Sequence, residues 1–112
     1  MSSERAMPSE IRHTTHPDGT QTVTVWGEVD IFNADRFDGV LEEAATGGEI
    51  VIDLRECRYI DSAAVAAIVR LRKRTQRGIR VIVDGKGAVR RVLEITKLDQ
   101  IVDLDPIAGK IV

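Results

Sequence analysis

Residues 50–62 read IVIDLRECRYIDS, and this stretch decides the fold of the 112-residue chain. Its first three residues are all apolar, which is typical of a central strand in a parallel sheet, where both faces are buried. Asp61 and Ser62 end the stretch, and an aspartate at that place can cap the N-terminus of a helix. A strand that leads directly into a capped helix indicates an α/β fold.

Beyond Ser62 the alternation of strand and helix continues. We expect the capped helix to run to about Gln76, with Gly78 as its C-cap, and its small apolar first half, residues 63–69, to be well buried. Pro106 is expected to end the regular structure. Between Gly78 and Pro106 the sequence predicts a strand over residues 79–83, a turn over 84–87, a helix over 88–96 and a short last strand or packed tail over 101–104.

Before residue 50, a turn signal at residues 16–19 separates two segments that predict a β-hairpin. The second segment, residues 20–26, alternates with Val23 and Val25 on one face, and Gly27 is expected to end it.

A helix is predicted over residues 34–45, with Asn33 as its N-cap and Gly47 and Gly48 closing it. Its apolar stripe consists of Phe37, Val40, Leu41 and Ala44.

The order β-β-α-β-α-β-α predicts a single α/β domain. About four strands should form a mixed sheet, an N-terminal hairpin followed by parallel strands, covered by helices. We expect residues 1–9 to be a flexible N-terminal tail, residues 10–105 to be the domain and residues 106–112 to be a C-terminal tail.

Composition excludes several classes of protein. Hydrophobic residues make up 43% and charged residues 30% of the chain, as in soluble globular proteins. No apolar run approaches the roughly 18 residues that span a bilayer, and residues 1–10 lack the apolar core of a secretory signal, so no membrane insertion is expected. The single cysteine, Cys57, cannot form an internal disulfide, which favours a cytoplasmic protein.

No set of residues points to catalysis. His13 and His16 are far in sequence from Ser62 and Cys57, and with Cys57 they are too few for a four-ligand zinc site. Cys57 is more typical of a small buried hydrophobe than of a nucleophile. Residues 84–87 read DGKG but lack the spacing of a phosphate-binding loop. We therefore expect no enzyme activity, no metal and no cofactor.

Charge is unevenly distributed along the chain. Residues 28–61 contain ten acidic and three basic residues, whereas residues 70–91 contain nine basic residues and one acid. This asymmetry fits either solvated helix faces or a charged partner surface. The basic stretch has no interleaved aromatic residues on which bases could stack, so we expect no direct contact with nucleic acid.

Local chemistry leaves two interpretations of Asp61 and Ser62. Either side chain can cap the helix, or the Ser62 hydroxyl can lie exposed at the positive end of the helix dipole.

Four segments resemble those of STAS domains in their order and spacing, over residues 10–105. Residues 25–30 look like the family's G-E-x-D segment, residues 50–54 like its h-h-h-D-L strand, residues 59–62 like its h-I-D-S segment and residues 88–99 like its V-x-x-x-L-x-x-T-G-L-D helix, where h is an apolar residue.

Small STAS domains of this kind resemble bacterial anti-sigma factor antagonists, and the resemblance implies partner switching. The unphosphorylated protein would bind an anti-sigma factor that is also a serine kinase, and so release a sigma factor for transcription. Phosphorylation of Ser62 would end this binding, and a serine phosphatase would restore it. The resemblance places partner binding at Glu28, Asp30, Asn33, Asp61, Ser62, Ala63 and Val65.

The expected oligomeric state is a monomer or weak dimer. The alternative function is a non-switched STAS scaffold subunit of a lipid-transport or signalling complex. The sequence departs from the family at two places. Ala63 and Ala64 replace the usual Ser/Thr-Gly pair after the serine, and we expect the methyl group of Ala64 to lie where a kinase approaches. Lys97 replaces the usual glycine of the last helix.

Overall fold

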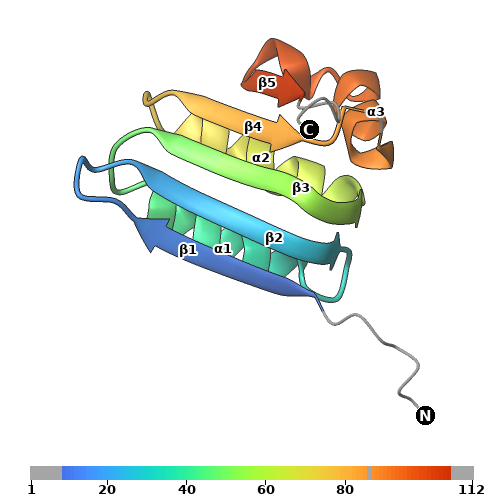
Figure 1. The fold of residues 1–112 in the computed structure, drawn as a ribbon, viewed down its shortest axis with the longest axis horizontal. Coiled ribbons are helices and arrows are strands. Elements are labelled where there is room, and N and C mark those ends of the chain that lie inside the picture. Colours follow the sequence, from blue (N-terminus) through green and yellow to red (C-terminus); the bar gives the residue numbers. More distant parts are fainter. Residues whose placement is uncertain (1–8, 86, 107–112) are drawn as a thin grey trace.

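The chain forms a five-stranded sheet with three α-helices in a computed structural model that describes residues 9–85 and 87–106 (Figure 1). The elements in chain order are β1 (Glu10–Thr15), β2 (Gln21–Val29), α1 (Ala34–Ala44), β3 (Ile50–Ile60), α2 (Ser62–Arg74), β4 (Ile79–Val83), α3 (Ala88–Ile95), the 3-10 helix η1 (Leu98–Gln100) and β5 (Asp103–Pro106). Most of the two predicted tails lies outside the described residues.

The strands lie side by side in chain order, from β1 to β5. β1 is antiparallel to β2, and all later pairs are parallel. This confirms the predicted α/β fold with a hairpin followed by parallel strands. The sheet has five strands rather than about four, because Asp103–Pro106 pairs with β4. Pro106 belongs to this strand and does not follow it. The segment reads DLDP, which is too short and too polar to give a clear alternation.

β2 does not end at Gly27, as the sequence suggested, but continues to Val29. Gly27 has a φ of +89°, and the register between β2 and β3 shifts beside it. Gly27 is therefore an irregular position within the strand and not its end. The extra residues lie on β3, because β2 advances by five residues from Thr24 to Val29 where β3 advances by seven from Asp53 to Ile60. Across these register shifts β2 and β3 stay paired to the same end of the sheet, where Val29 is opposite Ile60.

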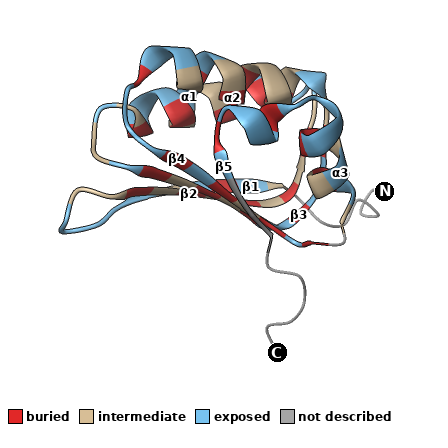
Figure 2. Cartoon of the chain, turned by 90° about the horizontal axis from the view of Figure 1, so that it is seen from above, coloured by how far each residue is buried: buried red, intermediate tan, exposed pale blue. Residues whose placement is uncertain are grey.

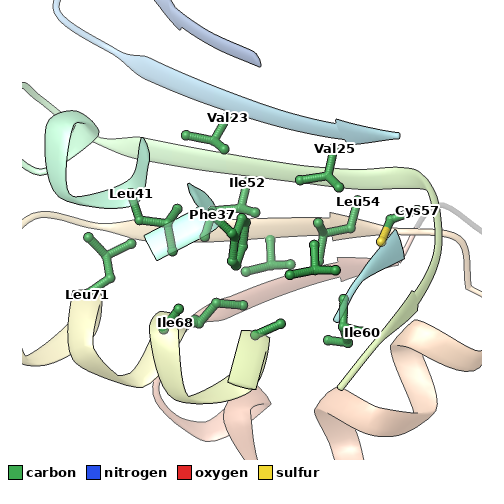
Figure 3. Packing of buried hydrophobic residues seen from close by; sticks show 14 of the residues in the cluster. Val23, Val25, Phe37, Leu41, Ile52, Leu54, Cys57, Ile60, Ile68 and Leu71 are labelled. Atoms are coloured by element: carbon green, nitrogen blue, oxygen red, sulfur yellow. The ribbon is translucent and has the colours of Figure 1, made fainter. Parts of the chain in front are cut away.

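The core lies between the sheet and helices α1 and α2, which cover one face of it (Figure 2). Val23 and Val25 of β2 point into the core together with Ile52 and Leu54 of β3 (Figure 3). From α1, Phe37, Leu41 and Ala44 are fully buried, as predicted, and Val40 is half-buried.

The predicted glycine caps are wrong for both helices. α1 ends at Ala45 in the right-handed conformation. Gly48 instead approaches the hairpin turn, where its amide donates to the Gly19 carbonyl over 2.8 Å. α2 ends before Gly78 because Thr75 turns the backbone into an extended conformation. The Arg72 guanidinium then donates to the carbonyl oxygens of Thr75 and Arg77, both over 2.8 Å.

Candidate functional site

The candidate site forms where the C-terminal ends of β2 and β3 meet. In the register of these parallel strands Glu28 lies opposite Tyr59, and Val29 opposite Ile60. The Asp61 amide then donates to the Val29 carbonyl over 3.1 Å. The loop of residues 30–33 and the start of α2 are therefore neighbours, as expected for loops that follow adjacent parallel strands.

Asp61 caps α2, as predicted. Its backbone is extended, and its Oδ1 accepts hydrogen bonds from the amides of Ala63, over 2.9 Å, and Ala64, over 3.3 Å. Ser62 is the first residue of the helix, and it is exposed. Within residues 9–85 and 87–106 no group forms a hydrogen bond with the Ser62 hydroxyl. Capping thus falls to Asp61 and leaves the Ser62 hydroxyl free.

The loop of residues 30–33 is held by its own polar side chains. The Asp30 carboxylate accepts from the Phe32 amide over 2.9 Å. The Asp30 amide donates to Asn33 Oδ1, and Asn33 Nδ2 donates to the Glu28 carbonyl, both over 2.9 Å. Asn33 therefore occupies the N-cap position of α1 without capping it, because its side chain is used to close the loop. This corrects the predicted role of Asn33.

Two large apolar side chains project from this loop, and neither is among the residues that the sequence predicts for the site. Phe32 is 92% exposed and Ile31 is 74% exposed. The available signal was an apolar pair between two residues that favour turns, Asp30 and Asn33.

The remaining predicted residues lie in the first turns of α2 and differ in how far they are buried. Ala63 and Val65 are half-buried beside Ser62, whereas Ala64 is fully buried. The methyl group of Ala64 therefore points into the core and does not lie on the approach to Ser62, contrary to the expectation. Residues 63–69 are also less buried than predicted, since Val65 and Val69 are only half-buried.

Glu28 lies at the edge of the site. Its carboxylate is 3.5 Å from the Arg58 guanidinium, and both side chains are substantially exposed. Such an exposed ion pair contributes at most about 1 kcal/mol, so the Glu28 carboxylate stays available to a partner.

A cavity of 280 Å³ lies next to this end of the sheet, between β3 beyond its pairing with β4 and the N-terminus of α3. Cys57 lines it and is buried, with its thiol donating to the Tyr59 carbonyl over 3.4 Å. Burial raises the pKa of the Cys57 thiol, and the Glu28 carboxylate adds to this, so the thiol stays protonated near neutral pH. Arg55 and Arg58 also line the cavity, but they pair with Asp53 and Glu28.

The histidines lie elsewhere. His13 Nε2 is 2.6 Å from Gln21 Oε1, and His16 Nε2 is 2.8 Å from Thr22 Oγ1, so both are at the hairpin, near the opposite ends of β2 and β3. Within the described part of the chain no three His, Cys, Asp or Glu residues form a group that could hold a metal ion. No helix among the described residues is long and apolar enough to cross a membrane.

Part of the basic stretch has a structural use. Arg70 pairs with Asp38 of α1 over 3.3 Å, and Arg90 pairs with Glu94 over 2.9 Å within α3. With Arg72 bound to carbonyl oxygens at the end of α2, these cations serve local contacts.

Comparisons with known proteins agree with this architecture. A sequence model described as the STAS domain matches residues 12–111. Two similar solved structures are an anti-sigma factor antagonist from Mycobacterium paratuberculosis (TM-score 0.79, 23% identity, 88% of this chain and 86% of that chain) and a putative anti-sigma factor antagonist from Thermotoga maritima (TM-score 0.70, 23% identity, 87% of each chain). The antagonist SpoIIAA in its unphosphorylated form is also similar (TM-score 0.63, 12% identity, 77% of this chain and 83% of that chain). At these identities the structures establish the shared fold. A comparison with curated proteins finds no match.

Proposed function

The chain belongs to the STAS domain family, and from this premise we propose that it is an anti-sigma factor antagonist switched by phosphorylation of Ser62. In its unphosphorylated form it binds an anti-sigma factor that is also a serine kinase, and a sigma factor is released. The kinase phosphorylates Ser62 and ends the binding. A serine phosphatase returns the protein to its binding form.

One observation carries this proposal, namely that Asp61 caps α2 and leaves the Ser62 hydroxyl exposed, with no partner among the described residues. A kinase needs a hydroxyl that it can reach without unfolding the helix. If Ser62 were the cap, phosphorylation would first have to break a capping bond. Here the Asp61 side chain caps the helix whether or not Ser62 is phosphorylated.

Phosphorylation would change the local charge strongly. A phosphoserine carries about −1.5 to −2 charges at pH 7. The N-terminus of α2 can stabilise such a charge by about 0.3–1 kcal/mol. In an interface, however, the phosphate would stand next to the Asp61 carboxylate and near the loop of Asp30, and it would lose its hydration. Binding would remove water from the phosphate and so strengthen its repulsion from the chain's own carboxylates at Asp61 and Asp30. This repulsion and the desolvation of the phosphate both oppose binding, so no large refolding is needed for the switch.

The partner surface that we propose combines the loop after β2 with the first turns of α2. Glu28 and Asp30 supply charge, Asn33 and Asp61 fix the backbone, and Ala63 and Val65 supply half-buried apolar contact beside Ser62. The protein acts in the cytoplasm as a monomer or weak dimer, without catalysis and without direct contact to nucleic acid.

The test uses purified anti-sigma factors with serine kinase activity from the source organism, screened one by one for binding. The binder is incubated with ATP and the chain, and mass spectrometry locates the phosphate. We expect phosphate on Ser62, none in Ser62→Ala, and binding of Ser62→Ala that persists in the presence of ATP. The matched control is Thr46→Ala, which removes an exposed hydroxyl at the C-terminal end of α1 and should be labelled like the wild type.

Two outcomes contradict the proposal. Phosphate found only on another residue, such as Ser9 or Thr75, removes Ser62 from the switch. Binding with no phosphate on any residue indicates a non-switched scaffold subunit instead.

A second experiment locates the surface. Arg74 is 12 residues beyond Ser62 in the same helix, or about 18 Å along its axis. The triple variant Arg70→Ala, Arg74→Ala, Arg77→Ala should therefore bind the anti-sigma factor as the wild type does, whereas Asp30→Lys should lose binding. The opposite result would move the interface to the basic stretch.

A further inference from the structure

The loop of residues 30–33 presents its apolar side chains outward although its backbone is well held. Phe32 and Ile31 are the two most exposed large hydrophobic side chains in the described part of the chain, at 92% and 74%. An isolated exposed apolar residue needs no explanation, but two adjacent ones at a candidate binding site do.

The loop conformation is fixed from several directions. The Phe32 amide is bound by the Asp30 carboxylate, and the Asp30 carbonyl accepts from the amides of Asn33, over 3.2 Å, and Ala34, over 2.9 Å. Asn33 binds both Asp30 and Glu28. Because the backbone is already ordered, little conformational entropy remains to be lost when the exposed side chains are buried by a partner.

We propose that Phe32, assisted by Ile31, is the apolar anchor by which this protein docks into a hydrophobic pocket of its anti-sigma factor; this rests on the proposed function. Aromatic side chains that enter a partner's pocket typically dominate binding energy, and phenylalanine can bury its whole ring there. The anchor lies on the loop joined to the start of α2 by the bond from Asp61 to Val29, so its contact and the state of Ser62 belong to one interface.

The charge around Phe32 indicates which side chains should line the edge of the partner's pocket. Asp30 lies in the loop, Asp35 lies in the first turn of α1, and the backbone of Asp61 is bonded to Val29 just before the loop. Glu28 adds a fourth carboxylate at the end of β2, against the cations Arg36 and Arg58. This net acidic rim fits a pocket whose edge carries basic side chains. A second copy of this chain would oppose one acidic rim to another, so self-association through Phe32 is disfavoured.

The experiment measures binding by calorimetry between the anti-sigma factor found above, without ATP, and the unphosphorylated chain. Phe32→Ala should weaken binding by about 10- to 100-fold, Ile31→Ala by about 3- to 10-fold, and Phe32→Trp should retain most of the affinity. The matched control is Ile95→Ala, which shortens a 71% exposed isoleucine on α3 and should leave binding unchanged. Because Phe32 is exposed, its replacement should leave the urea unfolding midpoint unchanged.

Rim charge is tested with Asp30→Asn, which keeps the oxygen that accepts from the Phe32 amide and removes the charge. Its association rate should fall and should depend less on salt than that of the wild type.

The outcomes separate the two proposals. If the wild type binds no anti-sigma factor, the proposed function fails. If the wild type binds and Phe32→Ala binds equally well, the anchor fails and the proposed function stands. If Phe32→Ala dissolves a wild-type homodimer in sedimentation without changing anti-sigma binding, the occupant is a second copy and the inference is overturned.

Discussion

The Asp61 amide donates a hydrogen bond to the Val29 carbonyl over 3.1 Å, and this bond joins the first turn of α2 to the loop after β2. Asp30 follows Val29 in the chain, and Ser62 follows Asp61. A residue that carries the proposed modification and a residue that shapes the exposed loop are therefore held together by backbone, not by mobile side chains. We therefore expect a partner that contacts one of them to contact the other as well.

The cap of α2 can be tested separately from the switch. Asp61→Ala removes the acceptor for the Ala63 and Ala64 amides and should lower the free energy of unfolding by about 1 kcal/mol. Asp61→Asn keeps an acceptor oxygen and should lose only a few tenths of that amount. Urea denaturation of both variants measures the difference. Equal losses would mean that the charge, and not the hydrogen bonds, stabilises the helix start.

Gly27 should not tolerate a side chain. Its φ of +89° is unfavourable for any L-residue by about 1–2 kcal/mol. In addition, a Cβ atom at this position would lie 2.8 Å from Ser9 Oγ and 3.0 Å from Ser9 Cα. We expect Gly27→Ala to lower the free energy of unfolding by at least about 1 kcal/mol. Gly39→Ala is the control, since nothing lies within 4 Å of its added Cβ and the substitution raises helix propensity. A neutral Gly27→Ala would show that the backbone of β2 can relax at this position.

Lys97 stands where the family pattern usually has a glycine, and its backbone conformation shows why a glycine is common there. It is the described non-glycine residue with positive φ, at +64°, and it follows Thr96, the C-cap of α3. Glycine adopts this left-handed conformation without strain, which is why it commonly follows a helix. Lys97→Gly should therefore raise the free energy of unfolding by about 0.5–1 kcal/mol in urea denaturation. Lys97→Ala keeps the Cβ and serves as the control. A gain from both variants would assign the effect to lost charge.

The sequence predicts the order of strands and helices along the chain well, because apolar periodicity marks each buried element, as in Val23 and Val25 or Phe37 and Leu41. The prediction from sequence fails where one residue type can have either of two structural roles. Gly27 predicts a strand end because a glycine at an irregular position within a strand and a glycine in a turn look alike in one sequence. Asn33 predicts a helix cap by residue type, and only the structure shows that its side chain turns back to Glu28 and Asp30.

At the site, the position of Ser62 after a capping aspartate was predictable, whereas the exposure of Phe32 was not. A phenylalanine before a predicted helix is usually a core residue, and nothing in the local sequence indicates that its backbone is held outward. That information resides in the Asp30 and Asn33 side chains, whose partners are set by the end of β2.

Cys57 should react slowly with thiol reagents. The residue is only 7% exposed, and burial raises the pKa of its thiol, so little thiolate is present at pH 8. We expect alkylation at pH 8 to be at least about tenfold slower in the folded protein than in urea. Because its pKa is raised, the Cys57 thiol holds its proton more tightly in the folded protein than in the unfolded chain. The resulting contribution to the free energy of unfolding is present at neutral pH and is lost as the pH rises above about 9. Rapid alkylation of the folded chain would show that the adjacent cavity admits the reagent.

Ser62→Asp should imitate the phosphorylated protein only in part. A carboxylate brings one negative charge and two oxygens to the start of α2, whereas a phosphate brings about −1.5 to −2 charges and three acceptor oxygens. The repulsion from Asp61 and the cost of desolvation are both smaller for the single charge. In calorimetry, affinity for the anti-sigma factor should fall in the order wild type, Ser62→Asp, phosphorylated protein. Ser62→Asn is the matched control, because it has the size of aspartate without its charge and should bind nearly as the wild type does. If Ser62→Asn loses as much affinity as Ser62→Asp, side-chain size and not charge opposes binding, and the electrostatic account of the switch is wrong.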